Sequence, residues 1–212
     1  MRTVLVDPAG YGFPYDHALC DALARLGCDA VLATPAGAGS EWPLERAYAE
    51  WGGFRESSVR HPRIARLPVI GGAFRALDHA LGLRRFLRHA KGLRPDVIHF
   101  VWLPLPVVDS PFLARLRRIC PLVLTLHNTT LFHGSPSSRI QGFGLPRVVR
   151  RFDRVVVHTE YSRRRLLDLG WAAPGSVRVI PHGALDGYTF PFFEEYLGEI
   201  LERLQLPSAV LR

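Results

Sequence analysis

The sequence predicts an α/β protein in which helices flank a parallel β-sheet, and two observations support this class. Short runs of apolar, mostly β-branched residues alternate with stretches whose apolar residues recur at helical spacing. The stretch from Arg154 to Gly183 reads strand, helix and strand within about thirty residues, which is a βαβ unit. Such a unit makes its two strands parallel and its crossover right-handed. Thr159 or Ser162 can cap the helix, and Gly170 can end it.

The N-terminal part predicts another βαβ unit. Thr3 to Asp7 is expected to be a buried strand, and Ala30 to Ala33 the next one. Between them we predict a helix from about Tyr15 to Leu26, where alanine and leucine recur at helical spacing and Gly27 follows as a terminator. A loop rich in glycine and proline, Pro8 to Pro14, joins the first strand to this helix.

The turn Gly10-Tyr11-Gly12 lies in that loop. It can present backbone N–H groups to an anion or a sugar hydroxyl at the start of the helix. It can also be a tight strand-to-helix turn without a ligand. The dinucleotide fingerprint G-x-G-x-x-G is not met, since Pro14 and Tyr15 occupy its later positions. The turn is therefore a candidate contact and not a signature of dinucleotide binding.

The middle of the chain predicts a long connection followed by a basic helix. Gly37 to Pro68 is rich in glycine, proline, arginine and aromatic residues, and we interpret it as an irregular connection packed by its own aromatic side chains. Phe74 to Ala90 predicts an amphipathic helix, whose apolar stripe comprises Phe74, Leu77, Leu81, Leu83, Phe86 and Leu87. The basic face of the Phe74–Lys91 helix is either solvated surface or a contact with anionic lipid.

Two apolar strands follow the basic helix. Val97 to Phe100 is predicted as a buried strand, with His99 inside the sheet and hydrogen-bonded. Pro121 to Leu126 is predicted as the next strand and continues into His127 and Asn128. A histidine at the carboxyl end of a parallel strand lies where ligands bind. His127 is therefore a candidate site residue, with a hydrogen-bonded buried histidine as the alternative.

The remaining elements are predicted from caps and chain breakers. Pro104 and Pro106 are expected to break the chain, and Asp109 is expected to cap the helix that follows them. Leu131 to Gly144 is interpreted as a loop over the site, and Leu145 to Phe152 as a short helix. The strands of the last βαβ unit are predicted at Val155 to Val157 and at Val177 to Ile180.

Composition and missing motifs exclude several classes of protein. The net charge of +8 comes almost wholly from arginine, because Lys91 is the only lysine. A coding bias or an anionic partner explains this charge, but the arginines are dispersed, so no specific nucleic acid is expected. The sequence lacks a P-loop, a nucleophile elbow of the serine hydrolases and a dinucleotide fingerprint. Its apolar runs are too short to span a membrane, and we expect a cytoplasmic protein.

The last βαβ unit also carries a resemblance. The residues DRVVVHTEYSRRRLLDLG and VRVIPHG resemble the closing unit of the N-terminal domain of GT-B glycosyltransferases of the family-four type. DVIHFVWLPLPVVD is similar to another strand of that domain. The resemblance covers Arg2 to Gly183 and implies one half of a GT-B fold, with a Rossmann-like acceptor domain in residues 1–183. Residues 184–212 would then be a linker and helix leading to a C-terminal nucleotide-sugar domain.

The resemblance implies a function as well. A sugar would move from a nucleotide-sugar donor to an acceptor hydroxyl, with retention of configuration, without a metal and with no cofactor besides the nucleotide-sugar substrate. His127 would be the catalytic residue near the donor sugar. The donor- or acceptor-binding residues would be Gly10, Tyr11, Gly12, Asp16, His17, Asn128, Glu160, Tyr161, Ser162, His182 and Gly183.

The implied partners follow from the same resemblance. A donor domain in cis or in trans would complete the enzyme, and the 212-residue chain alone would be inactive. The acceptor would be a glycan or a lipid-linked molecule, with peripheral contact at the inner face of an anionic membrane through the Phe74–Lys91 helix. The alternatives are a non-catalytic Rossmann-like binding subunit and a basic nucleic-acid-binding protein.

Overall fold

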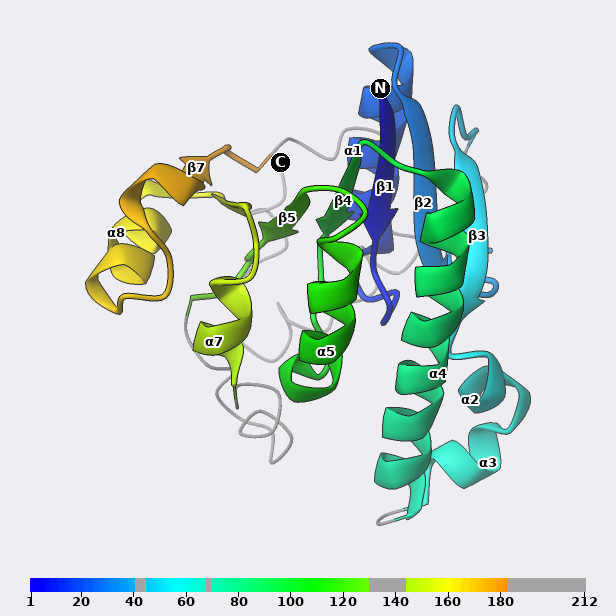
Figure 1. The fold of residues 1–212 in the computed structure, drawn as a ribbon. Helices are drawn as coiled ribbons and strands as arrows, with labels where there is room; N and C mark the ends of the chain where they lie inside the picture. Colours follow the sequence, from blue (N-terminus) through cyan, green and yellow to red (C-terminus); the bar gives the residue numbers. More distant parts are fainter. Residues whose placement is uncertain (41–44, 68–69, 130–143, 183–212) are drawn as a thin grey trace, which may run out of the picture. The chain divides into compact units, whose positions relative to one another are not determined.

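Seven parallel strands form one sheet in the part of the chain that the structure describes, namely residues 1–40, 45–67, 70–129 and 144–182 of a computed structural model (Figure 1). The order is β3-β2-β1-β4-β5-β6-β7, and every neighbouring pair is parallel. This confirms the predicted α/β class with a Rossmann-like sheet. The strands are β1 (Arg2–Val6), β2 (Asp29–Pro35), β3 (Ala49–Phe54), β4 (Val97–Phe100), β5 (Leu122–Thr125), β6 (Arg154–Val157) and β7 (Val177–Val179).

The strand order reverses beside β1. From β1 the chain moves outward through β2 to β3, then returns to β4 on the other side of β1 and continues toward β7. Val4 of β1 is paired in register with Val31 of β2 and with Ile98 of β4. In open parallel sheets, the crevice for a ligand lies at the carboxyl ends of the strands at such a switch point.

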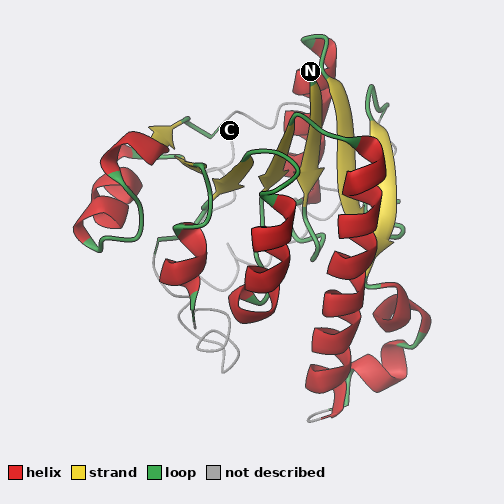
Figure 2. Ribbon diagram, viewed as in Figure 1, coloured by secondary structure: helices red, strands yellow, loops and turns green. Residues whose placement is uncertain are grey.

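Helices cover both faces of the sheet (Figures 1 and 2). Helices α4, α5 and α7 lie side by side over one face, whereas α1 lies behind the opposite face (Figure 1). The helices are α1 (Phe13–Arg25), α2 (Glu56–Arg60), α3 (Pro62–Ala65), α4 (Ile70–Leu93), α5 (Pro106–Leu116), α7 (Leu145–Val149) and α8 (Glu160–Asp168). A 3₁₀ turn (Pro174–Ser176) precedes β7.

The core is split by the sheet into two layers. Val4 and Val6 of β1 face the larger layer, which α4, α5, α7 and α8 cover. Leu5, between them in sequence, faces the smaller layer with Phe13 and Cys20 of α1. Because side chains alternate across a strand and both faces are covered, a central strand is apolar on both faces, apart from polar residues such as His99 that have a partner. This is why the apolar runs predict the central strands well.

The edge strand β3 was not predicted. The sequence interpretation of Gly37 to Pro68 as an irregular connection is wrong for its second half, which forms β3, α2 and α3. The strand AEWGGF contains two glycines, which normally weaken a strand. They fit here because a Cβ at Gly52 would lie 3.1 Å from the backbone of Ala36, and one at Gly53 would enter the ring of Trp51. Close packing, and not strand propensity, therefore selects these residues.

Helix α4 is longer than predicted, and its apolar stripe is confirmed only in part, since Leu83, Phe86 and Leu87 are buried. Leu77 and Leu81, placed in the predicted apolar stripe, are 60% and 40% exposed, whereas the polar residues Asp78 and His79 are buried. Asp78 accepts hydrogen bonds from the backbone N–H groups of α2, and His79 lies 2.5 Å from the carboxylate of Asp109. Polar residues are buried here because partners from other elements satisfy them.

Asp109 is not the cap of α5, as predicted, but lies inside its first turn. The helix begins at Pro106 after the N-cap residue Leu105. The fully buried carboxylate of Asp109 accepts from the backbone N–H of Leu105 and pairs with His79. The predicted N-cap Thr159 is confirmed, because its side-chain oxygen accepts from the N–H of Ser162.

Some predictions fall outside the described residues. These are nearly all of the predicted loop from Leu131 to Gly144 and the predicted linker and helix in 184–212. Among the helices that the structure describes, none combines the length and apolar character needed to cross a membrane.

Candidate functional site

A cavity of about 350 Å³ lies at the carboxyl edge of the sheet, over the switch point. Its lining comes from the segments that follow β1, β4, β5 and β7, together with the start of α1. The parallel arrangement of the strands brings these segments, far apart in the sequence, to one edge. The lining residues are Asp7, Tyr11, Gly12, Tyr15, Asp16, Val101, Trp102, His127 and His182.

Asp7 organises the glycine turn. One oxygen of its buried carboxylate accepts from the backbone N–H groups of Ala9 and Gly10, both at 2.9 Å, and the other accepts from Gly12 at 3.2 Å. The expectation that the turn presents its N–H groups to an anion is therefore not met for Gly10 and Gly12, because Asp7 already occupies them. Gly10 has a φ of +70°, a conformation that glycine adopts without strain.

Asp16 is a second carboxyl group beside Asp7, in the first turn of α1. It is 1% exposed. Burial, and after it the negative charge of Asp7, raise the pKa of Asp16 well above its usual value of 3.8. Because like charges at close range cannot both be ionised cheaply in a buried site, Asp16 retains a proton where a free aspartate would lose it.

Replacing Asp16 by asparagine is expected to stabilise the protein at alkaline pH and to have little effect near pH 4. The folded state binds the Asp16 proton more tightly than the unfolded state, so its stabilising contribution falls as the pH rises above 3.8. Asparagine keeps the shape without this cost. Thermal unfolding of both proteins should show a Tm difference that grows with pH to a few degrees, the shift that about 1 kcal/mol produces in a domain of this size. A pH-independent difference would contradict a protonated Asp16.

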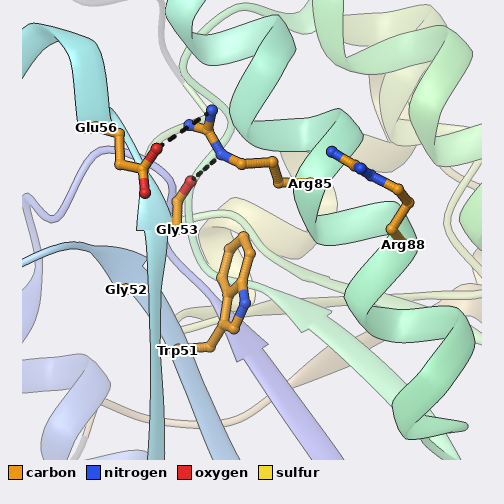
Figure 3. Close-up of a pocket in the computed structure, with 6 residues that line it drawn as sticks. All are labelled: Trp51, Gly52, Gly53, Glu56, Arg85 and Arg88. Atoms are coloured by element: carbon orange, nitrogen blue, oxygen red, sulfur yellow. Dashed lines mark hydrogen bonds and ion pairs between the residues drawn. The ribbon is translucent and has the colours of Figure 1, made fainter.

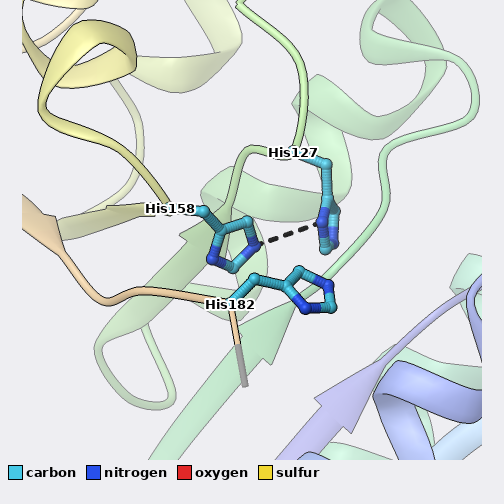
Figure 4. A group of neighbouring side chains, drawn as sticks. All are labelled: His127, His158 and His182. Atoms are coloured by element: carbon cyan, nitrogen blue, oxygen red, sulfur yellow. Dashed lines mark hydrogen bonds between the residues drawn. The ribbon is translucent and has the colours of Figure 1, made fainter. Parts of the chain in front are cut away.

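Three histidines gather next to this carboxyl pair (Figure 4). His127, His158 and His182 follow β5, β6 and β7, and His158 Nε2 lies 3.2 Å from His127 Nδ1. Nδ1 of His158 donates to the carbonyl oxygen of Ile180 at 2.9 Å. Desolvation first, and the neighbouring imidazoles second, lower the pKa of His127 to about 4, so its ring is neutral at physiological pH.

Tyr15 connects the histidines to helix α1. Its ring centroid lies 4.8 Å from that of His127, 5.6 Å from that of His158 and 5.1 Å from that of His182. The largely edge-on contacts are the favoured geometry for aromatic pairs. Behind them, His99 of β4 is paired with Thr125 Oγ1 at 2.7 Å, which agrees with its prediction as a hydrogen-bonded residue inside the sheet. Helix α1 thus packs against the three imidazoles of His127, His158 and His182 through Tyr15.

The structure brings together five of the predicted site residues in this cavity, namely Tyr11, Gly12, Asp16, His127 and His182. His17 is buried instead against Tyr48, whose hydroxyl lies 2.8 Å from its Nδ1, and does not line the cavity. The others outside its lining are Gly10, Asn128, Glu160, Tyr161 and Ser162, of which Ser162 serves the cap of α8. Gly183 lies outside the described residues.

Sequence reasoning missed four lining residues. Asp7, Val101 and Trp102 directly follow β1 and β4, the two strands of the switch point, and Tyr15 lies on α1. Trp102 contacts Tyr11 edge-on at 5.8 Å between ring centroids, and this pair forms an aromatic wall. The rule that ligands bind where strand order reverses could have indicated Asp7 and Trp102, but the strand order is not readable from the sequence.

A second cavity of about 290 Å³ shares Tyr11 with the first. It extends from the glycine turn to the N-terminal half of α4 and contains two arginines, Arg55 and Arg75. Arg55 donates to the carbonyl oxygen of Ala9 at 3.1 Å and so connects the segment after β3 to the turn. The lining residues are Pro8, Ala9, Tyr11, Arg55, Gly72, Arg75, Ala76, His79, Pro104 and Leu105.

A third cavity, of about 440 Å³, lies between the edge strand β3 and α4 (Figure 3). Arg85 extends from α4 toward the strand and donates to the carbonyl oxygen of Gly53 at 3.0 Å, with Glu56 3.5 Å away (Figure 3). No residue of this cavity lines either of the other two. Arg85 thus holds the edge strand β3 against α4, which is a structural role.

The fold and the site define a class of protein. A parallel sheet in this order, with a polar and aromatic cavity over its switch point, is a Rossmann-like domain. The sequence model of the glycosyl transferase 4-like domain matches residues 14–183, and the chain belongs to that family. No curated protein sequence matches the chain.

Solved structures show the same fold at low sequence identity. A glycosyltransferase of Rickettsia africae superposes with a TM-score of 0.53 at 16% identity, over 98% of this chain and 50% of its own. Arabidopsis thaliana UGT89C1 in complex with UDP-L-rhamnose superposes with a TM-score of 0.55 at 10% identity, over 92% of this chain and 55% of its own. Glycyrrhiza uralensis UGT73P12 superposes with a TM-score of 0.53 at 12% identity, over 87% of this chain and 48% of its own. The chain thus has the fold of one half of a GT-B glycosyltransferase and spans about half the length of these proteins.

Proposed function

We propose that this domain forms the acceptor side of a glycosyltransferase that moves a sugar from a nucleotide-sugar to an acceptor hydroxyl. Family membership supports glycosyl transfer in general. The observation that carries the placement is the cavity over the β1/β4 switch point, which combines a neutral imidazole at His127 with the aromatic wall of Tyr11 and Trp102. Aromatic faces suit sugar rings, and neutral imidazoles can donate to and accept from hydroxyl groups.

The chemistry of the proposal is a transfer with retention that needs no metal ion at the diphosphate. In the described cavity, three backbone N–H groups engage the carboxylate of Asp7, whereas burial and the charge of Asp7 raise the pKa of Asp16, so neither carboxyl group is favoured as a covalent nucleophile. A second, donor-binding domain, in cis or in trans, would neutralise the departing diphosphate and close the crevice against water. Without it, this domain is expected to show no turnover of a nucleotide-sugar.

The second cavity suggests how the acceptor reaches the site. It meets the first at Tyr11, and Arg55 and Arg75 give it positive charge. Arginine is the residue that best recognises phosphate groups. We therefore propose an acceptor with an anionic group, such as a lipid-linked phosphate, whose hydroxyl passes Tyr11 toward His127.

The exposed face of α4 supports a lipid-linked acceptor. Ile70, Leu77 and Leu81 are exposed and lie on one helical face with Arg84 and Arg88, at spacings of seven, four, three and four residues. Gly72, Arg75 and Ala76 of the same helix line the second cavity. Apolar side chains that enter a bilayer, with arginines beside them, are typical of peripheral contact with anionic lipid.

Replacing both Leu77 and Leu81 by glutamate is expected to weaken binding to vesicles of phosphatidylglycerol and phosphatidylcholine at least about tenfold, because two exposed leucines that would enter the bilayer are lost and two negative charges are added. Co-sedimentation at low and high salt measures this. Leu26→Glu, at the exposed C-cap of α1, is the control and should bind as the unchanged protein does. Absence of salt-sensitive binding by the unchanged protein would contradict the proposed membrane contact.

The transfer itself is tested with radiolabelled nucleotide-sugars and a lipid extract as the source of acceptors. The protein is supplied together with its donor-binding half. Label that appears in lipid only with one nucleotide-sugar, and only when both halves are present, is the expected result. Equal turnover by residues 1–212 alone, or strong salt-dependent retention of unrelated nucleic acids without any transfer, would contradict the proposal and favour the non-enzymatic alternatives.

A further inference from the structure

The three histidines at the carboxyl edge converge more closely than their proposed contact with a sugar requires. One ring nitrogen of each of His127, His158 and His182 lies within 4.8 Å of the other two (Figure 4). They follow three successive neighbouring strands, β5, β6 and β7. Each histidine lies within three residues of the end of its strand, so the sheet brings the three positions together.

The distance between His127 and His158 fits a metal site. In a tetrahedral zinc site with Zn–N bonds of about 2.0–2.1 Å, two ligand nitrogens are about 3.3 Å apart. His158 Nε2 and His127 Nδ1 are 3.2 Å apart. His182 completes the triangle at a longer distance. It is the exposed member of the cluster and is in ring contact with Tyr15, His127 and His158.

The hydrogen bond of His158 sets its tautomer. A carbonyl oxygen can only accept, so Nδ1 of His158 carries the proton that it donates to Ile180. In the neutral ring, Nε2 then accepts the hydrogen bond that links it to Nδ1 of His127, and a bound metal ion would take the place of that proton. A ligating histidine that donates its other N–H to a backbone carbonyl is the usual arrangement around protein-bound metals.

We propose that His127, His158 and His182 form a three-histidine site for a divalent transition-metal ion, with Zn²⁺ as the best fit. Imidazole nitrogens suit zinc, copper and nickel better than they suit magnesium or calcium. Three histidines with a fourth position left to water or another oxygen is a known zinc arrangement. His127 and His182 also line the cavity, so that position faces it. The site goes beyond the proposed function, which does not require a metal.

The proposal is tested with protein that carries no histidine tag and has been stripped with a chelator. Titration with Zn²⁺ against a coloured chelator should show one ion per chain, and Co²⁺ should give the visible absorption of a tetrahedral nitrogen site. His158→Ala and His182→Ala should each lower Zn²⁺ affinity at least about 100-fold, since even the loss of an outer-shell partner costs 10- to 100-fold. Each variant is compared by circular dichroism, and exposed His182 gives the variant least able to disturb the fold.

His61→Ala is the matched control, because His61 is exposed and lies after α2, outside the cluster. It should bind Zn²⁺ as the unchanged protein does. Absence of stoichiometric binding would overturn the proposal, and so would unchanged affinity in both cluster variants or an equal loss in the control. None of these results depends on sugar transfer, so they test the metal site independently of the proposed function.

Discussion

Replacing His127 by alanine is expected to lower the rate of sugar transfer by the complete enzyme about 100-fold, the loss typical of one polar group removed from a reacting centre. His127 follows β5 at the carboxyl edge and lines the cavity at the switch point. Its ring is neutral at physiological pH because burial lowers its pKa to about 4. In the proposed transfer, this neutral ring hydrogen-bonds the sugar without attracting the diphosphate. The expected 100-fold loss of rate corresponds to about 2.7 kcal/mol of transition-state stabilisation.

Initial rates with radiolabelled donor measure this effect. His61→Ala serves as the control, since it removes an exposed imidazole that lies away from the cavity. Asparagine at position 127 should recover part of the rate, because an amide can also donate and accept a hydrogen bond. A kcat for His127→Ala within twofold of the unchanged enzyme would mean that His127 lines the cavity without taking part in transfer.

Replacing Phe100 by alanine is expected to lower the free energy of unfolding by about 3–5 kcal/mol, the range for a buried phenylalanine in a core. Phe100 is fully buried at the end of β4, one of the two strands of the switch point. Its ring lies 6.4 Å from Phe86 of α4 and 5.9 Å from Phe152, measured between centroids. The change therefore opens a cavity where α4 and the segment between α7 and β6 meet the sheet, next in sequence to Val101 and Trp102 of the site.

Urea denaturation followed by circular dichroism measures the loss. Leu26→Ala is the control, because Leu26 is 81% exposed and its truncation should change stability by less than about 0.5 kcal/mol. A loss below about 1 kcal/mol for Phe100→Ala would show that the core relaxes around the missing ring and that β4 is not packed as described.

The central strands could be predicted from the sequence because they are covered on both faces. Strands β1, β5 and β6 carry apolar residues at consecutive positions, and β4 does so except at His99; this pattern is readable without knowing their neighbours. Helix boundaries followed from local signals in the same way: Thr159 caps α8, and Gly170 follows it with a φ of +63°. Both the central strands and the helix boundaries depend on residues close together in the sequence, so they can be predicted from one sequence.

The edge strand and the buried polar pairs could not be predicted, because distant residues decide them. The glycines of β3 are selected by the close approach of Ala36 and by Trp51 packing. On α4, His79 is buried because Asp109, thirty positions away, accepts its hydrogen bond. Helical periodicity classifies such a histidine as solvent-facing, and this is why Leu77 and Leu81 were assigned to the wrong face.

The candidate site was predictable only in outline. The rule that ligands bind at the carboxyl ends of parallel strands located His127, and the family resemblance implied His182; both line the cavity. The same rule could not show that Asp7 occupies the N–H groups of Gly10 and Gly12, because that contact depends on the path of the loop. The convergence of three imidazoles likewise requires the strand order and the register, which only the structure supplies.

Hydrogen–deuterium exchange of the complete enzyme, with and without its donor and acceptor, tests most directly whether the carboxyl edge at the switch point forms the transfer site. The account predicts slower exchange in the segments after β1 and β4, around Tyr11 and Trp102, and no change at the opposite edge, around Asp29 and Asp96. Protection at the opposite edge, with none near Tyr11 and Trp102, would contradict it.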